Sequence, residues 1–221
     1  LENKESPSMK EFIKSAIPVM QKHLKKSRNI RFSGDNYSEE WTDEAAKRGL
    51  PNIEKSFDAF DAFRHEKTKK AFDQVLTESE LLSRYDIIVD LYSGSVNIEA
   101  NLMIELFNTQ ILPAAILYQR KFADSIRLAS EQLAMSLDMQ KQRLRKIANC
   151  INLSIQHIND LETARDKANA SGLSTEERGR IFSHEVTDIC KKARSEVDAL
   201  EGLVDDKLWP LPKYRELLFL I

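Results

Sequence analysis

Apolar residues recur at steps of three and four along most of this chain, which is the spacing of a helix with one buried face. The pattern predicts a first helix over residues 7–26, with Pro18 as a kink inside it. A capping-box pattern, Thr77-Glu-Ser-Glu80, predicts the start of a long helix, and Gly94 is where we expect that helix to bend before Pro113. The pattern therefore favours a mainly α fold.

The longest helical pattern runs from Ala114 to Ser171, which is 58 residues without Gly or Pro. One continuous helix of that length would extend about 87 Å. A heptad repeat of apolar residues runs through it, with polar interruptions at Gln140 and Ser154. The repeat consists of Leu137, Leu144, Ile151 and Ile158, with Leu133, Ile147 and Leu161 on the companion positions. Such a narrow stripe requires partner helices, and the sequence leaves open whether the span is one rod or breaks near its polar positions.

The next element is the expected partner. Gly172 suits the end of one helix, and a second capping box, Ser174-Thr-Glu-Glu177, suits the start of another. Apolar residues then continue at helical steps as far as Val204. The short connection predicts an antiparallel helical hairpin, which together with the helix from Thr77 makes a bundle of three or more long helices.

A different local pattern lies between Arg28 and Pro51. Ile30 and Phe32 alternate with polar neighbours, which predicts a short strand, and Gly34-Asp35-Asn36 supplies turn chemistry. Ser38 is the expected cap of a helix that ends at Gly49. A helical region over residues 52–75 follows this strand–turn–helix block. Its expected apolar face consists of Phe57, Phe60, Phe63 and Phe72.

Composition narrows the class of protein. The chain has 221 residues, of which 42% are hydrophobic and 31% charged, with only six Gly and six Pro, as in a soluble helical protein. A net charge of −2 gives no overall attraction to nucleic acid or to an anionic membrane. No apolar run approaches the roughly 20 residues that cross a bilayer. Cys150 and Cys190 make no disulfide framework, which favours a reducing cytoplasm.

The sequence contains no recognisable catalytic, cofactor-binding or metal-ligating set. The nucleotide-binding and nucleophile-elbow motifs are missing, and no histidine has a metal-ligand spacing. The two cysteines lie beside isoleucines and are expected to be small core residues. A basic cluster is expected to be a solvated helix face. An acidic cluster is expected to lie at the start of a helix, where negative charge is favourable. The residues concerned are His23, His65, His157 and His184, then Lys141, Arg143, Arg145 and Lys146, then Glu39, Glu40, Asp43 and Glu44.

The C-terminal segment, residues 208–221, is rich in aromatic residues and prolines. Trp209, Tyr214 and Phe219 are the candidate interface residues, because apolar clusters near a terminus often contact another protein. Docking of the same residues onto the chain's own bundle is an equally good alternative.

Five blocks in order along the chain resemble type III glutamine synthetases. They are Asn36-Tyr-Ser-Glu-Glu-Trp41, Lys47-Arg-Gly-Leu-Pro-Asn52, Leu76-Thr-Glu-Ser-Glu-Leu-Leu-Ser-Arg-Tyr85, Val96-Asn-Ile-Glu-Ala100 with Gln110-Ile-Leu-Pro-Ala-Ala115, and Leu208-Trp-Pro-Leu-Pro-Lys-Tyr-Arg-Glu-Leu-Leu-Phe219. The resemblance implies the C-terminal part of an ATP-dependent glutamate–ammonia ligase that uses magnesium or manganese. The family's metal, nucleotide and phosphate-binding residues lie upstream, so no catalytic, cofactor or metal residue is carried over.

The resemblance also implies a division of the chain. Residues 1–75 resemble the end of the α+β catalytic domain, of which the strand–turn–helix block is a remnant. Residues 76–207 resemble the helical bundle extension of type III enzymes, and residues 208–221 form the tail. The isolated chain is then expected to be inactive, cytoplasmic and structural. It would contact its own catalytic domain and the neighbouring subunits of a homo-oligomeric ring, with no nucleic acid and no membrane as partner.

The alternative function is a free-standing cytoplasmic helical-bundle adaptor. It would show the same heptads, but it has no need of the strand–turn–helix block. A metal-dependent bundle enzyme would need inward carboxylates and Glu-x-x-His pairs, which the sequence lacks.

Overall fold

A computed structural model describes residues 8–133 and 135–218. The chain forms two compact units, Leu1–Glu54 and Lys55–Ile221. The described residues are mostly helical and include no strand, which confirms the mainly α fold. The unit division falls at Glu54, so the short helices after it pack with the long bundle.

The first unit contains helix α1 (Met9–Lys26), a 3₁₀ turn η1 (Arg28–Ile30) and helix α2 (Glu39–Lys47). Ser8 caps α1 in a full capping box with Glu11, and Pro18 lies inside the helix. As predicted, Ser38 caps α2 by accepting a hydrogen bond from the Trp41 backbone N–H at 3.3 Å.

The predicted strand at Ile30 and Phe32 is wrong. Ile30 ends η1, and the Phe32 ring stacks on Trp41 with 4.7 Å between ring centroids. Arg48 Nη1 donates to the backbone carbonyls of Arg28, Asn29 and Arg31 at 3.5, 3.3 and 2.8 Å. These carbonyls are satisfied by a side chain, so the segment needs no neighbouring strand.

The second unit begins with three short helical pieces, α3 (Ser56–Phe60), η2 (Asp61–Arg64) and α4 (Glu66–Phe72). Phe57 is buried against Tyr85 and Val89, and Phe60 and Phe63 pack on the same cluster. Phe72 is exposed, so it does not belong to the apolar face predicted for it.

A continuous helix of 55 residues follows, from Glu78 to Gln132. It consists of α5 (Glu78–Leu106), a π turn η3 (Phe107–Ile111) and α6 (Leu112–Gln132). The Thr77 capping box starts it as predicted, and α5 continues through Gly94. Proline has no N–H for the helix ladder, and the π turn ends two residues before Pro113, so the widened turn accommodates the proline.

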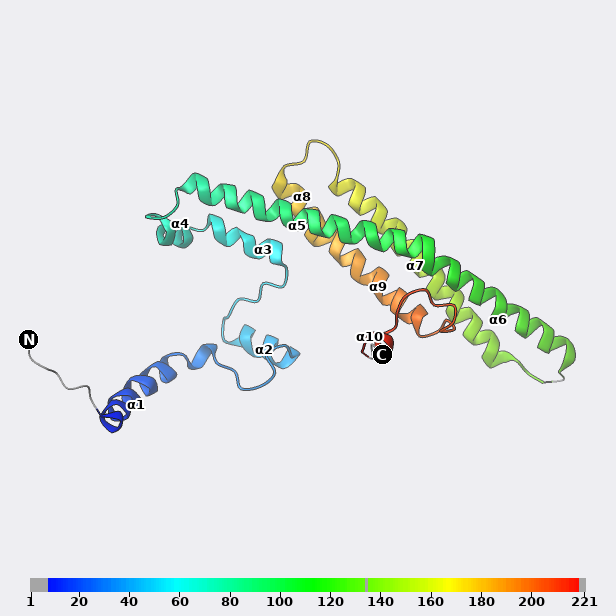
Figure 1. Cartoon of the computed structure of the whole chain (residues 1–221), viewed down its shortest axis with the longest axis horizontal. Coiled ribbons are helices and arrows are strands. Elements are labelled where there is room, and N and C mark those ends of the chain that lie inside the picture. Colours follow the sequence, from blue (N-terminus) through cyan, green and yellow to red (C-terminus); the bar gives the residue numbers. More distant parts are fainter. Residues whose placement is uncertain (1–7, 134, 219–221) are drawn as a thin grey trace, which may run out of the picture. The chain divides into compact units, whose positions relative to one another are not determined.

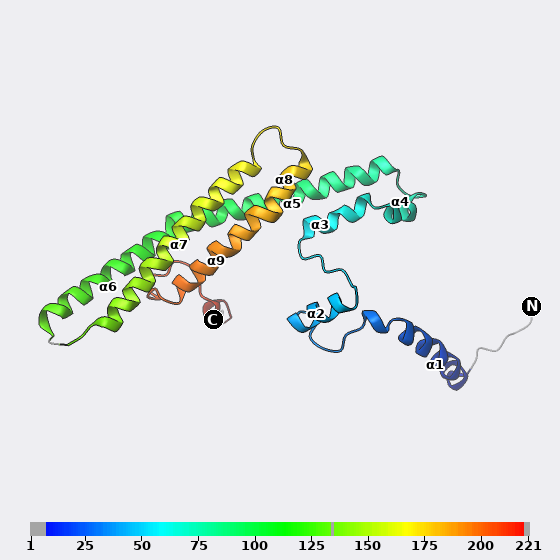
Figure 2. The same cartoon turned by 180° about the vertical axis from the view of Figure 1, so that it is seen from behind.

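The span from Ala114 to Ser171 is two helices. α6 ends at Gln132, and α7 (Asp138–Ala168) runs back beside it (Figures 1 and 2). The α7 heptad residues Ile147, Ile151, Ile158 and Leu161 are buried as predicted, whereas Leu133, at the turn, is exposed. Folding back lets α6 and α7 bury their apolar faces against each other, which a single rod could not do.

α7 ends before Gly172, which has a positive φ of 91° as its place at a helix end predicts. The return arm consists of α8 (Thr175–Ile181), a π turn η4 (Phe182–Val186) and α9 (Thr187–Glu201). α9 packs along α7, so the antiparallel hairpin is confirmed (Figure 1). The main core lies between α5–α6, α7 and α8–α9, with Phe107, Ile147, Leu161 and Phe182 almost fully buried.

The chain closes with a Pro-containing segment and helix α10 (Tyr214–Leu218). Trp209 lies in the main core, where it is 8% exposed. The domain boundaries predicted at residues 75 and 207 do not coincide with the unit division at Glu54. They stay a prediction about the longer protein.

Candidate functional site

A group of charged side chains in the second unit lies where α3 and η2 meet α8, η4 and α9. We call it the α3–α8 junction. Its members are Lys55, Asp58, Asp61, Arg64, Glu176, His184 and Asp188. These residues come from segments more than 100 positions apart, so the tertiary fold alone brings them together.

Arg64 is the centre of the junction. Its guanidinium donates to the two Glu176 carboxylate oxygens at 2.8 and 3.4 Å, and its Nε donates to Asp61 at 2.8 Å. It also lies over the Tyr85 ring at 4.4 Å. The hydrogen bond that Glu176 accepts from Arg64 lowers the pKa of Glu176, and the hydrogen bonds that Arg64 donates to Glu176 and Asp61 raise the pKa of Arg64. The arrangement is a bidentate ion pair stacked on an aromatic ring, a geometry that favours arginine over lysine.

Lys55 joins the start of the unit to the return arm. Its Nζ donates to the Ser183 carbonyl oxygen and to an Asp188 carboxylate oxygen, both at 2.9 Å. The hydrogen bond to Asp188 lowers the pKa of that carboxyl. His184 Nε2 lies 2.9 Å from an Asp58 carboxylate oxygen. Glu176, Asp188 and Asp58 are therefore each engaged by a basic side chain. Such an arrangement holds the helices together.

The two thiols are not activated nucleophiles. Burial raises the pKa of the Cys150 thiol, and it raises that of Cys190 to about 11. A thiol with a raised pKa is protonated at neutral pH and is a poor nucleophile. This agrees with the sequence interpretation of both as packing residues.

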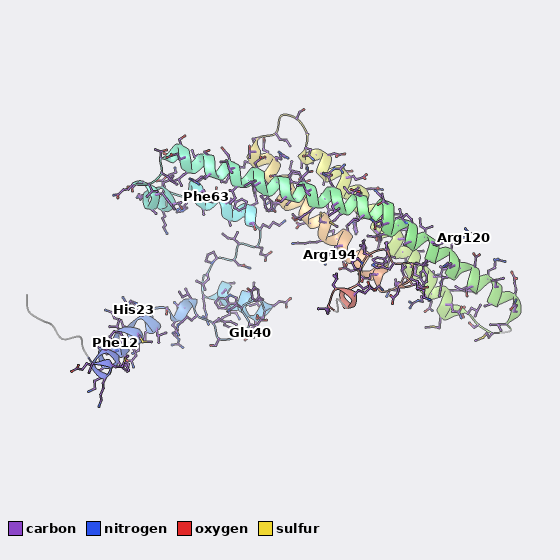
Figure 3. All side chains as sticks on the ribbon, in the orientation of Figure 1. Phe12, His23, Glu40, Phe63, Arg120 and Arg194 are labelled. Atoms are coloured by element: carbon purple, nitrogen blue, oxygen red, sulfur yellow. The ribbon has the colours of Figure 1, made fainter. Side chains whose placement is uncertain are left out.

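The remaining histidines and the basic cluster lie on helix surfaces or at helix ends, where several of them make local contacts. His65 accepts a hydrogen bond from the Lys67 backbone N–H and caps α4, and His157 lies 4.0 Å from Asp160 on the surface of α7. His23 lies in the last turn of α1 (Figure 3). In the basic cluster, Arg143 donates to the Leu203 carbonyl oxygen at 3.4 Å.

The acidic cluster is carried by α2, where Glu40 is in the first turn (Figure 3) and Glu44 pairs with Arg48 at 2.7 Å. Across residues 8–133 and 135–218, no group of three or more His, Cys, Asp or Glu side chains could hold a metal ion. These residues therefore do not fit a divalent metal.

The three candidate interface residues have different outcomes. Trp209 is buried in the chain's own core, as the docking alternative expects. Tyr214 begins α10, and its side chain lies outside what the structure describes, as does all of Phe219. An interface role for the tail stays a prediction.

Two exposed apolar helix faces were missed by the sequence analysis. α1 has no buried residue, so its apolar face, which includes Phe12, is open (Figure 3). α5 has a second apolar face opposite its buried one, formed by Ile87, Leu91, Ile98 and Leu102. The sequence does indicate the α5 face, because the apolar residues of this helix occupy more of its circumference than one buried face requires.

One helix of the described residues, the continuous segment Glu78–Gln132, is long and apolar enough to cross a membrane. The sequence analysis expected a long helix here but no apolar run of the length that crosses a bilayer. A single helix of this kind is weak evidence, because the core helices of soluble proteins have the same length and composition.

Comparison with known proteins identifies the family. The glutamine synthetase C-terminal domain family matches residues 15–130, slightly more than half of the chain. The chain belongs to this family. The type-3 glutamine synthetase of Dictyostelium discoideum is 32% identical over 198 residues, which are 86% of this chain and 27% of that protein. This confirms the resemblance to type III enzymes.

Two bacterial glutamine synthetases are similar to nearly the whole chain. That of Bacteroides fragilis is 31% identical over 209 residues, 91% of this chain and 28% of the relative. That of Butyrivibrio fibrisolvens is 26% identical over 208 residues, again 91% of this chain and 29% of the relative. The chain thus spans less than a third of the length of the curated relatives it matches.

Proposed function

We propose that this chain is part of a larger ATP-dependent glutamate–ammonia ligase, in which it is a structural and oligomerisation extension. The observation that carries the proposal is the family match, combined with a span of about 28% of a relative named glutamine synthetase. Most of such a relative's length lies outside the matched part and is available for the catalytic residues. The family match also favours the ligase over the free-standing adaptor.

The ligase reaction joins ammonia to the γ-carboxylate of glutamate. ATP first phosphorylates that carboxylate, and ammonia then displaces phosphate to give glutamine. Magnesium or manganese would bind the nucleotide phosphates and offset the charge that develops on them. No step of this chemistry is assigned to the described residues, because they do not fit a metal and the carboxylates of the α3–α8 junction contact basic side chains.

A bracing role agrees with the way the second unit is built. α7 has 31 residues and is therefore about 46 Å long. It is held by apolar packing on both neighbours, and the α3–α8 junction connects α3 and η2 to the return arm that packs along it. The exposed apolar faces of α1 and α5 would contact the catalytic domain of the same polypeptide or neighbouring subunits of a ring. We propose a cytoplasmic location for the assembly, with residues 1–75 closing the catalytic domain and residues 76–207 extending from it.

The proposal is tested by assaying γ-glutamyl transfer with manganese and nucleotide. The chain of residues 1–221 alone should show no turnover, while the full polypeptide from the same reading frame, assayed in parallel, should be active. Appreciable turnover by the isolated chain would remove the scaffold role. A reading frame that begins near Leu1 would instead support the adaptor.

A further inference from the structure

The outer face of α5 carries a continuous apolar stripe. Its side chains are well exposed, at 56% for Ile87, 66% for Leu91, 68% for Ile98 and 52% for Leu102. Together with Gly94 they form what we call the outer stripe. At 100° per residue its five members lie within a sector of about 80°, and they extend over about 22 Å of helix. Single exposed apolar residues are ordinary, but a contiguous stripe of this kind indicates a contact surface.

The outer stripe is nearly symmetric about the midpoint between Gly94 and Ser95. Ile87 and Leu102 lie equally far from that midpoint on its two sides, and so do Leu91 and Ile98. A two-fold axis at the midpoint, perpendicular to the helix, would set the α5 helices of two copies antiparallel. Ile87 of each copy would then face Leu102 of the other. A self-complementary surface of this kind is what an isologous dimer contact requires.

Charge follows the same symmetry. Arg84 and Glu105 are exposed on the same face and are also equidistant from the midpoint. Within the described part of the chain, neither side chain forms an ion pair. The two-fold axis would bring Arg84 of each copy opposite Glu105 of the other, giving two ion pairs. A parallel arrangement would instead set Arg84 against Arg84, which is unfavourable.

Gly94 suits the crossing point. A Cβ built there meets nothing within 4 Å, so packing inside the chain does not require glycine at this position. Glycine within a helix is less stable than alanine, yet α5 continues through it. The missing side chain would let two helix backbones approach closely at the centre of the contact.

We propose that α5 pairs antiparallel with α5 of a second copy of this chain through the outer stripe. This inference rests on the oligomerisation role proposed above and names the surface that carries it. Four apolar side chains per copy cover less than the roughly 800 Å² per partner of a stable protein interface. The contact is therefore weak between isolated chains and is reinforced in a larger assembly.

The test is a charge-reversal cycle on the chain of residues 1–221, with self-association measured by sedimentation equilibrium up to about 500 µM at low salt. Arg84→Glu alone and Glu105→Arg alone should each weaken the dimer at least about five-fold, because each leaves like charges opposed. The double reversal should restore the dissociation constant to within about two-fold of the unmodified chain. Arg120→Glu, a reversal on the exposed surface of α6 (Figure 3), is the matched control and should change nothing. Circular dichroism checks that every variant is folded.

Three results would overturn the inference. One is a chain that stays monomeric over the whole concentration range. Another is a double reversal that fails to restore association after both single reversals weaken it. The third concerns the variant Ile98→Asp. If this variant no longer binds phosphatidylcholine vesicles that the unmodified chain binds, but self-associates as strongly as the unmodified chain, then the stripe contacts lipid and not a second copy. Turnover by the isolated chain would remove the proposed function without touching this contact, so the two can fail separately.

Discussion

Gly179 of α8 allows the return arm to lie directly against its neighbours. A Cβ at this position would lie 2.6 Å from the Phe57 ring and 2.7 Å from a Val89 methyl group. Both neighbours are buried, and Val89 is fully so. The missing side chain therefore determines how closely α8 approaches α5 and α3.

Gly179→Ala is expected to lower the free energy of unfolding by about 1–3 kcal/mol, because the added methyl group has to displace buried side chains. Urea denaturation monitored by circular dichroism measures the change. Gly202→Ala is the matched control, since a Cβ there makes only an ordinary contact at 3.6 Å and the backbone is already helical. A Gly179→Ala variant as stable as the control would show that α8 has room to move.

At the scale of helices, ion pairs as well as apolar packing hold one element against another. Arg64 in η2 and Glu176 in α8 connect two segments that are 112 residues apart in sequence. The hydrogen bond from Arg64 holds the pKa of Glu176 below its ordinary value of 4.5. A carboxylate with a lowered pKa in the folded state stabilises the fold above its ordinary pKa. That contribution is lost as the pH falls through the folded-state value.

Glu176→Gln is therefore expected to be less stable than the unmodified chain at pH 7, by about 1 kcal/mol for a partly exposed pair. The difference should persist down to pH 4.5 and close below it, as Glu176 itself becomes protonated. Urea unfolding at pH 7, 5, 4 and 3.5 measures it. Glu162→Gln, at a carboxylate without an ion pair in the described residues, should show no such trend. A gap between Glu176→Gln and the unmodified chain that stays constant with pH would contradict the assigned ion pair.

The whole molecule is two compact units joined by a short segment without secondary structure. Residues 51–54 are exposed, and they form neither helix nor strand. Exposed backbone outside helices and strands has little to hold it in place.

Limited proteolysis with thermolysin should first cut beside Ile53, which is exposed in this segment. The expected product retains the complete second unit, and mass spectrometry of the early fragments identifies the cut. Early cleavage inside α7 or α9 would show that the bundle is less stable than its buried core indicates.

Local signals in the sequence determined where most helices begin and end. Ser38, Thr77 and Ser174 cap helices because a capping side chain bonds a backbone N–H only three residues ahead. Gly172 lies in the connection just after α7, where the backbone needs a positive φ that costs glycine little. Ile147, Ile151, Ile158 and Leu161 of the α7 heptad pattern are buried as predicted, whereas Leu144 is half-buried; helical periodicity shows one face without knowledge of the partner.

Tertiary structure alone decided the break between α6 and α7, the failure of the strand at Ile30, and the α3–α8 junction. The turn between α6 and α7 contains no Gly or Pro, and it forms because two apolar faces are buried only when the chain folds back. The strand pattern would have needed a neighbouring strand, and Arg48 satisfies the carbonyls in its place. Each of these features depends on residues distant in the sequence, whereas capping and helix ends depend on neighbours within one helical turn.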